Sequence, residues 1–399
     1  MMVIQWVSHF SCFRPGRKNR HGPFPDNVLI DILSRLPADA ILQCRKVCRH
    51  WRALTSSRAF VKVQNQRAPS VVVVQGQRLG LLARRDYFVY DALAKKLRKI
   101  PFKSKLGFVG RGKTFKNKTI SLHGACGPLL HIKASGYYYL STGLNDFAFN
   151  LITRQLVAVN TRNDDYVCGL FFNEARNEYN YLCLRWLPEK SARFYVYGLD
   201  SRKDVEIASS PFSFGSCSDR SPVVVNQVVY LVVDRMEQDV NHCMHAILVF
   251  DMDSGEFCNI PHPEFECPGT RLHHFGMYLF ARDGHLCLCR SDTERGLLDI
   301  WTLEDYANWS WVPLGSTISL RIPKGPEEAA RFAILSVRKD ELLVYWDSSL
   351  FLVNSKDESV EEIEMPYKGR FRLSFFAYRS TLAAPHLVRD GGKSPLFRL

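Results

Sequence analysis

The spacing of hydrophobic residues along the chain changes from helical to β near residue 69. Before that point, apolar side chains recur at positions i, i+3, i+4 and i+7, which predicts a helix with one apolar stripe. The stripe consists of Leu29, Ile32, Leu33 and Leu36. Pro25 and Asp26 form a helix-start signal, because a carboxylate there can cap free backbone amides. Pro37 ends this helix, since proline cannot continue the backbone hydrogen bonds.

A second helical stretch follows, which Asp39 can cap and which we expect to be kinked. Its key positions are Ile41, Leu42, Arg45, Val47, Cys48, Trp51 and Leu54. A block this small cannot bury all of its aliphatic surface on itself, and each large apolar side chain removed from water contributes about 1.5–3 kcal/mol. The stripe therefore packs either on the rest of the chain or in a partner's groove, and periodicity does not choose between them.

After residue 69 the chain is built from short β runs, beginning with Ser70–Val74. One phrase recurs six times: an alternating strand that ends in an aromatic or large residue, a polar turn, then a short strand running towards proline. Equivalent positions are Tyr90, Phe149, Tyr197, Phe250, Trp301 and Val353, at intervals of 59, 48, 53, 51 and 52 residues. A period near 50 in an all-β chain predicts a propeller with four strands per blade.

Two further strands precede the phrase where the pattern can be tested. They span 279–281 and 285–289 before Trp301, and 332–337 and 341–346 before Val353. Six copies favour six blades, with residues 371–377 left over as a strand that could close the ring; seven blades stay open as the alternative.

The helical block resembles the F-box motif in order and spacing. The residues that carry the resemblance are Phe24, Pro25, Leu29, Ile32, Leu33, Leu36, Pro37, Ile41, Leu42, Arg45, Val47, Cys48, Trp51, Arg52 and Phe60. The run 47–52 is the most specific piece, whereas Phe24 stands where leucine is usual and Cys44 where phenylalanine is common. In that family the block binds a small Skp-family adaptor, which tethers it to a cullin–RING ubiquitin ligase.

The resemblance implies an adaptor-binding set on this chain. The set is Phe24, Pro25, Leu29, Ile32, Leu33, Leu36, Pro37, Ile41, Leu42, Val47, Cys48 and Trp51. The body resembles the kelch-like F-box-associated domain of plant F-box proteins, and the phrase 149–155 is similar to one common there, although the kelch double glycine is missing from the blades. The resemblance thus implies a substrate adaptor of a ubiquitin ligase, with an unidentified target protein, no cofactor and no catalytic residue.

Composition and cysteine use set the expected organisation. We expect a disordered basic arm at 1–22, a small all-α domain at 23–62, an all-β propeller at 70–385 and a tail at 386–399. Hydrophobic content of 46% indicates a globular protein, and no apolar run reaches the length of a membrane span. Twelve scattered cysteines without a signal-peptide pattern indicate free thiols in a reducing compartment, so we expect the nucleus and/or the cytoplasm.

The net charge of +13 is concentrated locally. Between Lys95 and Lys118 there are ten Lys and Arg residues and no acid, with three phenylalanines interleaved. Such a segment could bind nucleic acid through phosphate contacts and stacking, which is the alternative function. We favour a solvated insertion, with Lys113, Lys116 and Lys118 as candidates for contact with an acidic target surface.

Other chemical motifs lack their structural context. Residues 107–114 match the P-loop pattern, but no core strand precedes them and no helical period follows. The groups Cys258/His262/Cys267 and His242/Cys243/His245 have metal-ligand types without a second half-site, and Cys287 and Cys289 alternate as packing residues do. We therefore expect no metal, no nucleotide site and no catalysis by this chain.

Overall fold

We describe a computed structural model of the chain. It describes residues 24–382 except 69, 79–84, 93, 101–108, 111–112, 115–118, 136–145, 154, 160–164, 187–191, 210–221, 233–245, 265–276, 293–294, 316, 321–331, 337–339, 347–348 and 366–370. The predicted arm at 1–22 and tail at 386–399 lie outside the described residues. The chain divides into two compact units, Met1–Arg67 and Ala68–Leu399.

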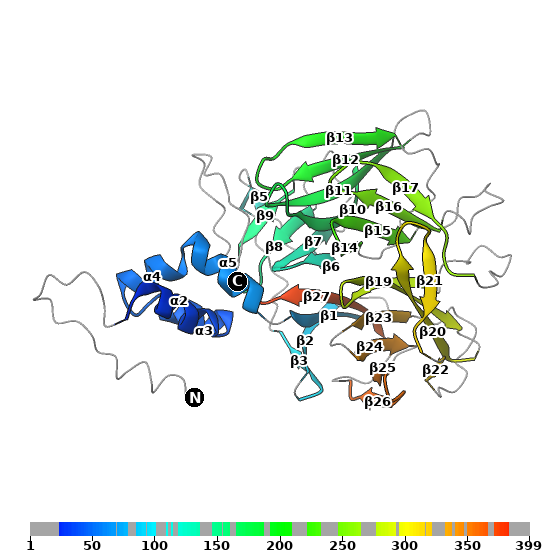
Figure 1. Ribbon diagram of the computed structural model, residues 1–399. Helices are drawn as coiled ribbons and strands as arrows, with labels where there is room; N and C mark the ends of the chain where they lie inside the picture. Colours follow the sequence, from blue (N-terminus) through cyan, green and yellow to red (C-terminus); the bar gives the residue numbers. More distant parts are fainter. Residues whose placement is uncertain are drawn as a thin grey trace, which may run out of the picture. The chain divides into compact units, whose positions relative to one another are not determined.

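The first unit is helical (Figure 1). Its helices are α2 (Asp26–Ser34), α3 (Ala38–Cys44), α4 (Arg49–Thr55) and α5 (Arg58–Arg67). The first helix is confirmed, whereas the single kinked stretch expected after it is two helices. The break arises because Cys48 has an extended backbone, with φ −156° and ψ 167°, and its Sγ accepts a hydrogen bond from the backbone N–H of Trp51, which starts α4.

The predicted carboxylate caps of α2 and α3 are not formed. Pro25 and Pro37 occupy the two N-cap positions, and Asp26 and Asp39 lie inside the first turns instead. Carboxylates in the first turn still interact favourably with the positive end of the helix dipole. The two prolines therefore start these helices through their fixed φ angle rather than through a side-chain hydrogen bond.

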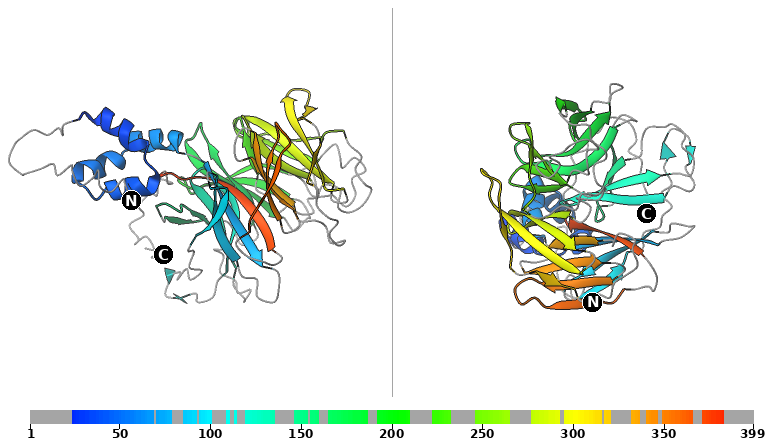
Figure 2. Two further views of the ribbon diagram at one scale, coloured as in Figure 1. Left: turned by 90° about the horizontal axis from the view of Figure 1, so that it is seen from below. Right: turned by 90° about the vertical axis from the view of Figure 1, so that its right-hand side faces the viewer.

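The second unit is a ring of β-sheets (Figures 1 and 2). Blade 1 contains β27 (Phe371–Arg379), β1 (Ser70–Arg78), β2 (Arg85–Asp91) and β3 (Lys96–Lys99). Blade 2 contains β6 (Thr119–Cys126), β7 (Leu129–Ser135), β8 (Asp146–Phe149) and β9 (Leu156–Ala158). Blade 3 contains β10 (Asp165–Asn173), β11 (Glu178–Trp186), β12 (Ala192–Gly198) and β13 (Asp204–Ser209).

The remaining blades follow in chain order. Blade 4 contains β14 (Val223–Val225), β15 (Val228–Val232), β16 (Ile247–Asp251) and β17 (Phe257–Ile260). Blade 5 contains β18 (Met277–Arg282), β19 (His285–Asp292), β20 (Leu297–Asp305), β21 (Ser310–Pro313) and β22 (Ile318–Ser319), which pairs with β20. Blade 6 contains β23 (Phe332–Ser336), β24 (Glu341–Trp346), β25 (Ser349–Asn354) and β26 (Val360–Ile363). A separate hairpin consists of β4 (Val109–Gly110) and β5 (Lys113–Thr114).

The six-blade prediction is confirmed, and the seven-blade alternative is wrong. All six residues that the repeat marked as equivalent lie on the third strand of their sheets: β2, β8, β12, β16, β20 and β25. The left-over C-terminal segment is β27, which pairs antiparallel with β1 from Ser70↔Arg379 to Arg78↔Phe371. It is the inner strand of blade 1 and lies against β6 and β23 of the two neighbouring blades. The last described strand of the chain therefore closes the ring.

The core of the ring lies between the blades. Six clusters of buried apolar residues each join two neighbouring blades, and one of them joins blade 6 to blade 1. Alternate residues of a strand belong to opposite clusters: Val73 packs towards blade 2, while Val72 and Val74 pack towards blade 6. Because both faces of the strand are buried, the sequence there is a continuous apolar run instead of an alternating one.

Candidate functional site: the exposed apolar face of the helical unit

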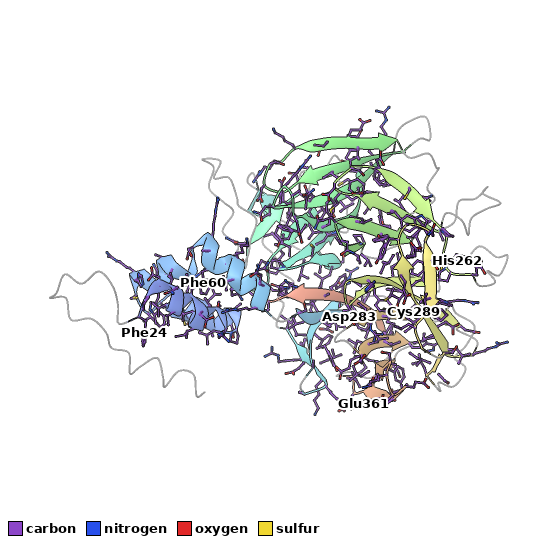
Figure 3. The ribbon with its side chains drawn as sticks, viewed as in Figure 1. Phe24, Phe60, His262, Asp283, Cys289 and Glu361 are labelled. Atoms are coloured by element: carbon purple, nitrogen blue, oxygen red, sulfur yellow. The ribbon has the colours of Figure 1, made fainter. Side chains whose placement is uncertain are left out.

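The helical unit has a complete core of its own. Leu29, Leu33, Ile41, Cys44, Leu54 and Phe60 are buried, and Phe60 is fully inaccessible (Figure 3). The Arg45 guanidinium crosses between helices, donating to the carbonyl of Thr55 at 2.8 Å and to its hydroxyl at 3.3 Å. Large side chains that stay outside this core are therefore available for another surface.

Exposed apolar side chains gather on this unit. Six large hydrophobic residues are exposed in the described part of the chain, and four of them lie here: Phe24 (43%), Val28 (36%), Ile32 (49%) and Val47 (41%). Val28 and Ile32 are four residues apart on α2, so they share one side of the helix. We call these four residues the apolar face. Several large apolar side chains exposed on one small folded unit make that unit a candidate interaction site.

Polar contacts border this face and fix the helices that carry it. His50 Nε2 lies 3.0 Å from Asp26 Oδ1, which ties the start of α4, just after Val47, to the start of α2. At the other end of α2, Arg67 of α5 lies 2.8 Å from Asp31 Oδ1 and donates to Ser34 Oγ at 2.7 Å. Hydrogen bonds from Arg35 and Arg67 lower the pKa of Asp31.

The structure divides the twelve predicted adaptor-binding residues into three groups. Phe24, Pro25, Ile32, Pro37 and Val47 are exposed, and Leu36, Leu42, Cys48 and Trp51 are half-buried. Leu29, Leu33 and Ile41 are buried within the unit, so they can act on a partner only by holding the helices in place. The sequence analysis missed Val28. Its spacing of four residues from both Phe24 and Ile32 could have identified it as part of the same surface.

The basic segment is described only in part. Lys113 lies in β5, its side chain is not described, and Lys116 and Lys118 lie outside the described residues. Val109 pairs with Thr114 and Gly110 with Lys113 in an antiparallel hairpin. A P-loop needs its lysine and threonine to begin a helix, so this backbone is incompatible with that motif.

The candidate metal ligands are not brought together in the described residues. Cys258 is exposed, His262 is buried with Nδ1 at 2.6 Å from the Pro263 carbonyl, and Cys267, His242, Cys243 and His245 lie outside the described residues. Cys287 and Cys289 both pack in the cluster between blades 5 and 6, as their alternation predicted. Among the described residues, no group of three metal-binding side chains is present.

Buried ion pairs in the propeller were not predicted. Asp165, with a side chain 2% exposed, receives two hydrogen bonds from Arg185 at 2.6 and 2.8 Å, and the guanidinium lies 3.9 Å from the ring centroid of Tyr195. In blade 2, His131 Nε2 lies 2.8 Å from Asp146 Oδ1. Both pairs join neighbouring strands within one blade, and they serve the fold.

Comparison with known proteins decides the family. An F-box-like model matches residues 24–62, and a model described as the F-box associated beta propeller domain matches residues 111–366, which is more than half of the chain. The chain belongs to the F-box-associated β-propeller family. With its F-box, it is a plant-type F-box protein, and the helical unit described above is that F-box.

Two Arabidopsis thaliana proteins are similar to this chain over most of their length. F-box protein At5g18160 is 22% identical over 311 residues, covering 75% of this chain and 72% of its own. F-box protein At3g07870 is 25% identical over 327 residues, covering 75% and 74%. Among solved structures, TolB from Acinetobacter baumannii aligns over 81% of this chain and 72% of its own, at 10% identity and a TM-score of 0.44, which is too low to bear on function.

Family membership supports an adaptor role in general terms. F-box proteins are generally non-catalytic substrate adaptors, and an F-box implies a Skp-family adaptor and a cullin–RING ligase. The kelch-like character of the repeats is not established by these matches. Among the helices that the structure describes, none has the length and hydrophobicity needed to cross a membrane.

Proposed function

We propose that this F-box protein is the substrate-recognition subunit of an SCF-type ubiquitin ligase, with the apolar face as the surface that binds the Skp-family adaptor. The observation that carries the proposal is the concentration of exposed apolar side chains on a helical unit whose own core is already filled. Such a surface gains free energy when a partner covers it, because each large apolar side chain contributes on the order of 1–3 kcal/mol when removed from water.

The propeller then carries the target. F-box and propeller are separate compact units, so either can bind its partner while the other keeps its fold. Ubiquitin transfer is accelerated by proximity, since holding the target near a loaded conjugating enzyme raises the effective concentration of its lysines. The chain contributes binding and position, and we propose that none of its residues performs covalent chemistry.

The test is adaptor binding by surface variants. In Val28→Glu/Ile32→Glu, two charges replace exposed apolar groups without touching the core, so we expect a loss of affinity of about 100-fold or more with an unchanged melting temperature. Val205→Glu is the matched control, because Val205 is 45% exposed on the propeller. Adaptor binding by the folded double variant at wild-type affinity would overturn the assignment.

Core variants are less informative in this assay. Leu33 is 3% exposed, and Leu33→Ala should cost the helical unit about 2–5 kcal/mol of stability. A loss of adaptor binding in that variant would follow from unfolding alone. The surface pair therefore identifies the docking face, whereas Leu33 identifies only the fold.

The protein's place of action is also a proposal. We propose the nucleus and/or the cytoplasm, where thiols stay reduced. The eight cysteines that the structure describes are all free, which supports this proposal. Fusion to a fluorescent protein, read by microscopy in plant cells, tests it directly.

A further inference from the structure

The charge of the propeller is divided between its two halves. Residues 70–222, which include blades 2 and 3 and most of blade 1, hold 23 Lys and Arg against 12 Asp and Glu. Residues 223–365, which form blades 4–6, hold 11 against 24. The basic excess is strongest in residues 92–163, where thirteen Lys and Arg accompany a single acid, Asp146. That acid is buried and bonded to His131, so it does not neutralise the surface around it.

The outer edge of blade 1 presents part of this charge on a strand. β3 is the last strand of its sheet, and Lys96 and Arg98 on it are both exposed. Residues 96, 98 and 100 point to the same side of the strand, because side chains alternate along it. Ile100 packs in the cluster between blades 1 and 2, so Lys96 and Arg98 lie on the side that faces blade 2. Leu97 points the other way, towards the cluster between blades 6 and 1.

Two neighbouring cations, Lys95 just before β3 and Lys99 within it, are already paired with carboxylates, so Lys96 and Arg98 are the candidates for binding a partner. Lys99 Nζ lies 2.8 Å from Asp86, and Lys95 forms an ion pair with Glu361 of β26 in blade 6 (Glu361 is labelled in Figure 3). The Lys95–Glu361 pair shows that a carboxylate of the neighbouring blade can bind a cation near this edge. On β2, the exposed Asp91 lies opposite Lys96 in the strand register, whereas Arg98 lies opposite Val89. Residues 92–163 offer no exposed carboxylate within the described residues.

The backbone of β3 completes a binding edge. Ile100 N–H donates to the Tyr87 carbonyl, so in an antiparallel pair Arg98 and Lys96 also direct their backbone groups to β2. The backbone groups of Leu97 and Lys99 then face away from the sheet, where an added strand could pair with them. Lysines on an edge strand oppose pairing with the same strand of a second copy, because like charges repel. For the same reason they favour an added strand that carries carboxylates.

We propose that the outer edge of blade 1 binds an acidic, extended segment of the target protein, which adds to β3 and places alternate carboxylates against Lys96 and Arg98. The proposal rests on the proposed function, in which the propeller carries the target. Alternate residues of a strand point to the same side, so the i, i+2 spacing of the two cations matches carboxylates at i, i+2 of the added segment. A nucleic acid could pair its phosphates with Lys96 and Arg98, but it would leave the outward N–H and C=O groups of Leu97 and Lys99 without a strand partner. A protein segment satisfies both, and we therefore favour it.

The experiment uses the full chain without a partner, and adaptor binding is measured separately. The probe is a fluorescein-labelled eight-residue peptide of alternating Glu and Val, followed by fluorescence anisotropy at low and high salt. We expect binding that weakens with salt and falls at least tenfold in Lys96→Glu/Arg98→Glu. The matched control is Lys203→Glu/Lys356→Glu, which changes the net charge equally at exposed turn residues and should stay within twofold of wild type.

Three further arms separate the explanations. An alternating Lys–Val peptide should not bind, and the Glu–Val peptide methylated on alternate backbone nitrogens should bind at least tenfold less tightly. Equal binding by wild type and Lys96→Glu/Arg98→Glu would overturn the proposal, as would no binding by wild type. Tighter binding of a single-stranded RNA octamer with the same dependence on Lys96 and Arg98 would assign the edge to nucleic acid instead.

The adaptor assay keeps this result independent of the proposed function. Lys96→Glu/Arg98→Glu should retain wild-type adaptor binding, because neither residue belongs to the helical unit. If adaptor binding fails in the wild-type chain while the peptide result holds, the ligase role is wrong and the acidic-strand site stands. If adaptor binding holds and the peptide result fails, the edge is not the target site.

Discussion

Asn150 is the residue whose replacement should most clearly test how the ring is closed. It is fully buried in the turn that follows β8. Its Oδ1 accepts hydrogen bonds from the backbone amides of Ile152 at 2.8 Å and Thr153 at 2.9 Å, and from the Tyr378 hydroxyl at 3.3 Å. Its Nδ2 donates to the Thr381 carbonyl at 3.2 Å. One amide thus joins a turn of blade 2 to the ring-closing strand and the residues after it.

Asn150→Ala removes these four hydrogen bonds at once. Two backbone amides, a hydroxyl and a carbonyl lose a partner, and a buried polar group without one costs about 1–3 kcal/mol. The two contacts beyond 3.1 Å are weak, so we expect a total loss of about 3–5 kcal/mol. Tyr378→Phe removes the hydroxyl but leaves the other three hydrogen bonds of the Asn150 amide in place, and it should cost about 1 kcal/mol, which makes it the matched control.

Urea denaturation followed by circular dichroism measures both variants. The midpoint should fall far more in Asn150→Ala than in Tyr378→Phe, with similar slopes, because the surface exposed on unfolding hardly changes. Limited proteolysis should also release the C-terminal segment first in Asn150→Ala, since its anchoring is weakened. Equal midpoints for the two variants would refute the assignment of Asn150 as the tie between blade 2 and the closing strand.

Two buried ion pairs carry the remaining predictions. Burial raises the pKa of Asp146, but the hydrogen bond and charge of His131 and the charge of Lys133 outweigh it, so the net pKa is lowered. The folded state therefore gains stability from ionised Asp146 above the unfolded pKa near 3.9, and loses it as pH falls through the lower folded value. Asp146→Asn should flatten the loss of stability below about pH 4, which urea midpoints at pH 7 and pH 3.5 would show; an identical pH profile would contradict it. Arg185→Met should cost about 3–5 kcal/mol because it leaves Asp165 buried without its cation, and Asp165→Leu/Arg185→Met should be milder than the single change. A double variant less stable than Arg185→Met would argue against this account.

Much of the fold could be predicted because its signals are local and repeated. The six repeat positions mark the third strand of every blade, since each is followed by a polar turn and a short outer strand. The ring-closing strand was predicted because residues 371–377 form a β run that remains after the six repeats are assigned. The break at Cys48 was missed because a cysteine is an uncommon N-cap, and only the backbone angles show it.

The candidate site was less predictable from sequence. Ile32 and Leu33 are neighbours with similar side chains, yet one is 49% exposed and the other 3%. Periodicity places both on an apolar stripe, but which edge of the stripe meets α4 and α5 depends on tertiary packing. The ion pair of Asp165 with Arg185 depends on strand register across twenty residues, which a sequence pattern does not specify.

The position of β27 after the other blade strands sets the order in which the ring is made during synthesis. The helical unit leaves the ribosome before the propeller, and five blades follow before the inner strand of blade 1 exists. A message that stops before residue 371 would yield an open ring, with Val73 of β1 lacking its neighbours Phe376 and Tyr378. Under the proposed function, such a truncated product would still contain the helices that bind the adaptor. It would therefore occupy the ligase without presenting a target. Premature stop codons in the last blade should therefore act as dominant inhibitors of the intact protein, rather than as simple losses.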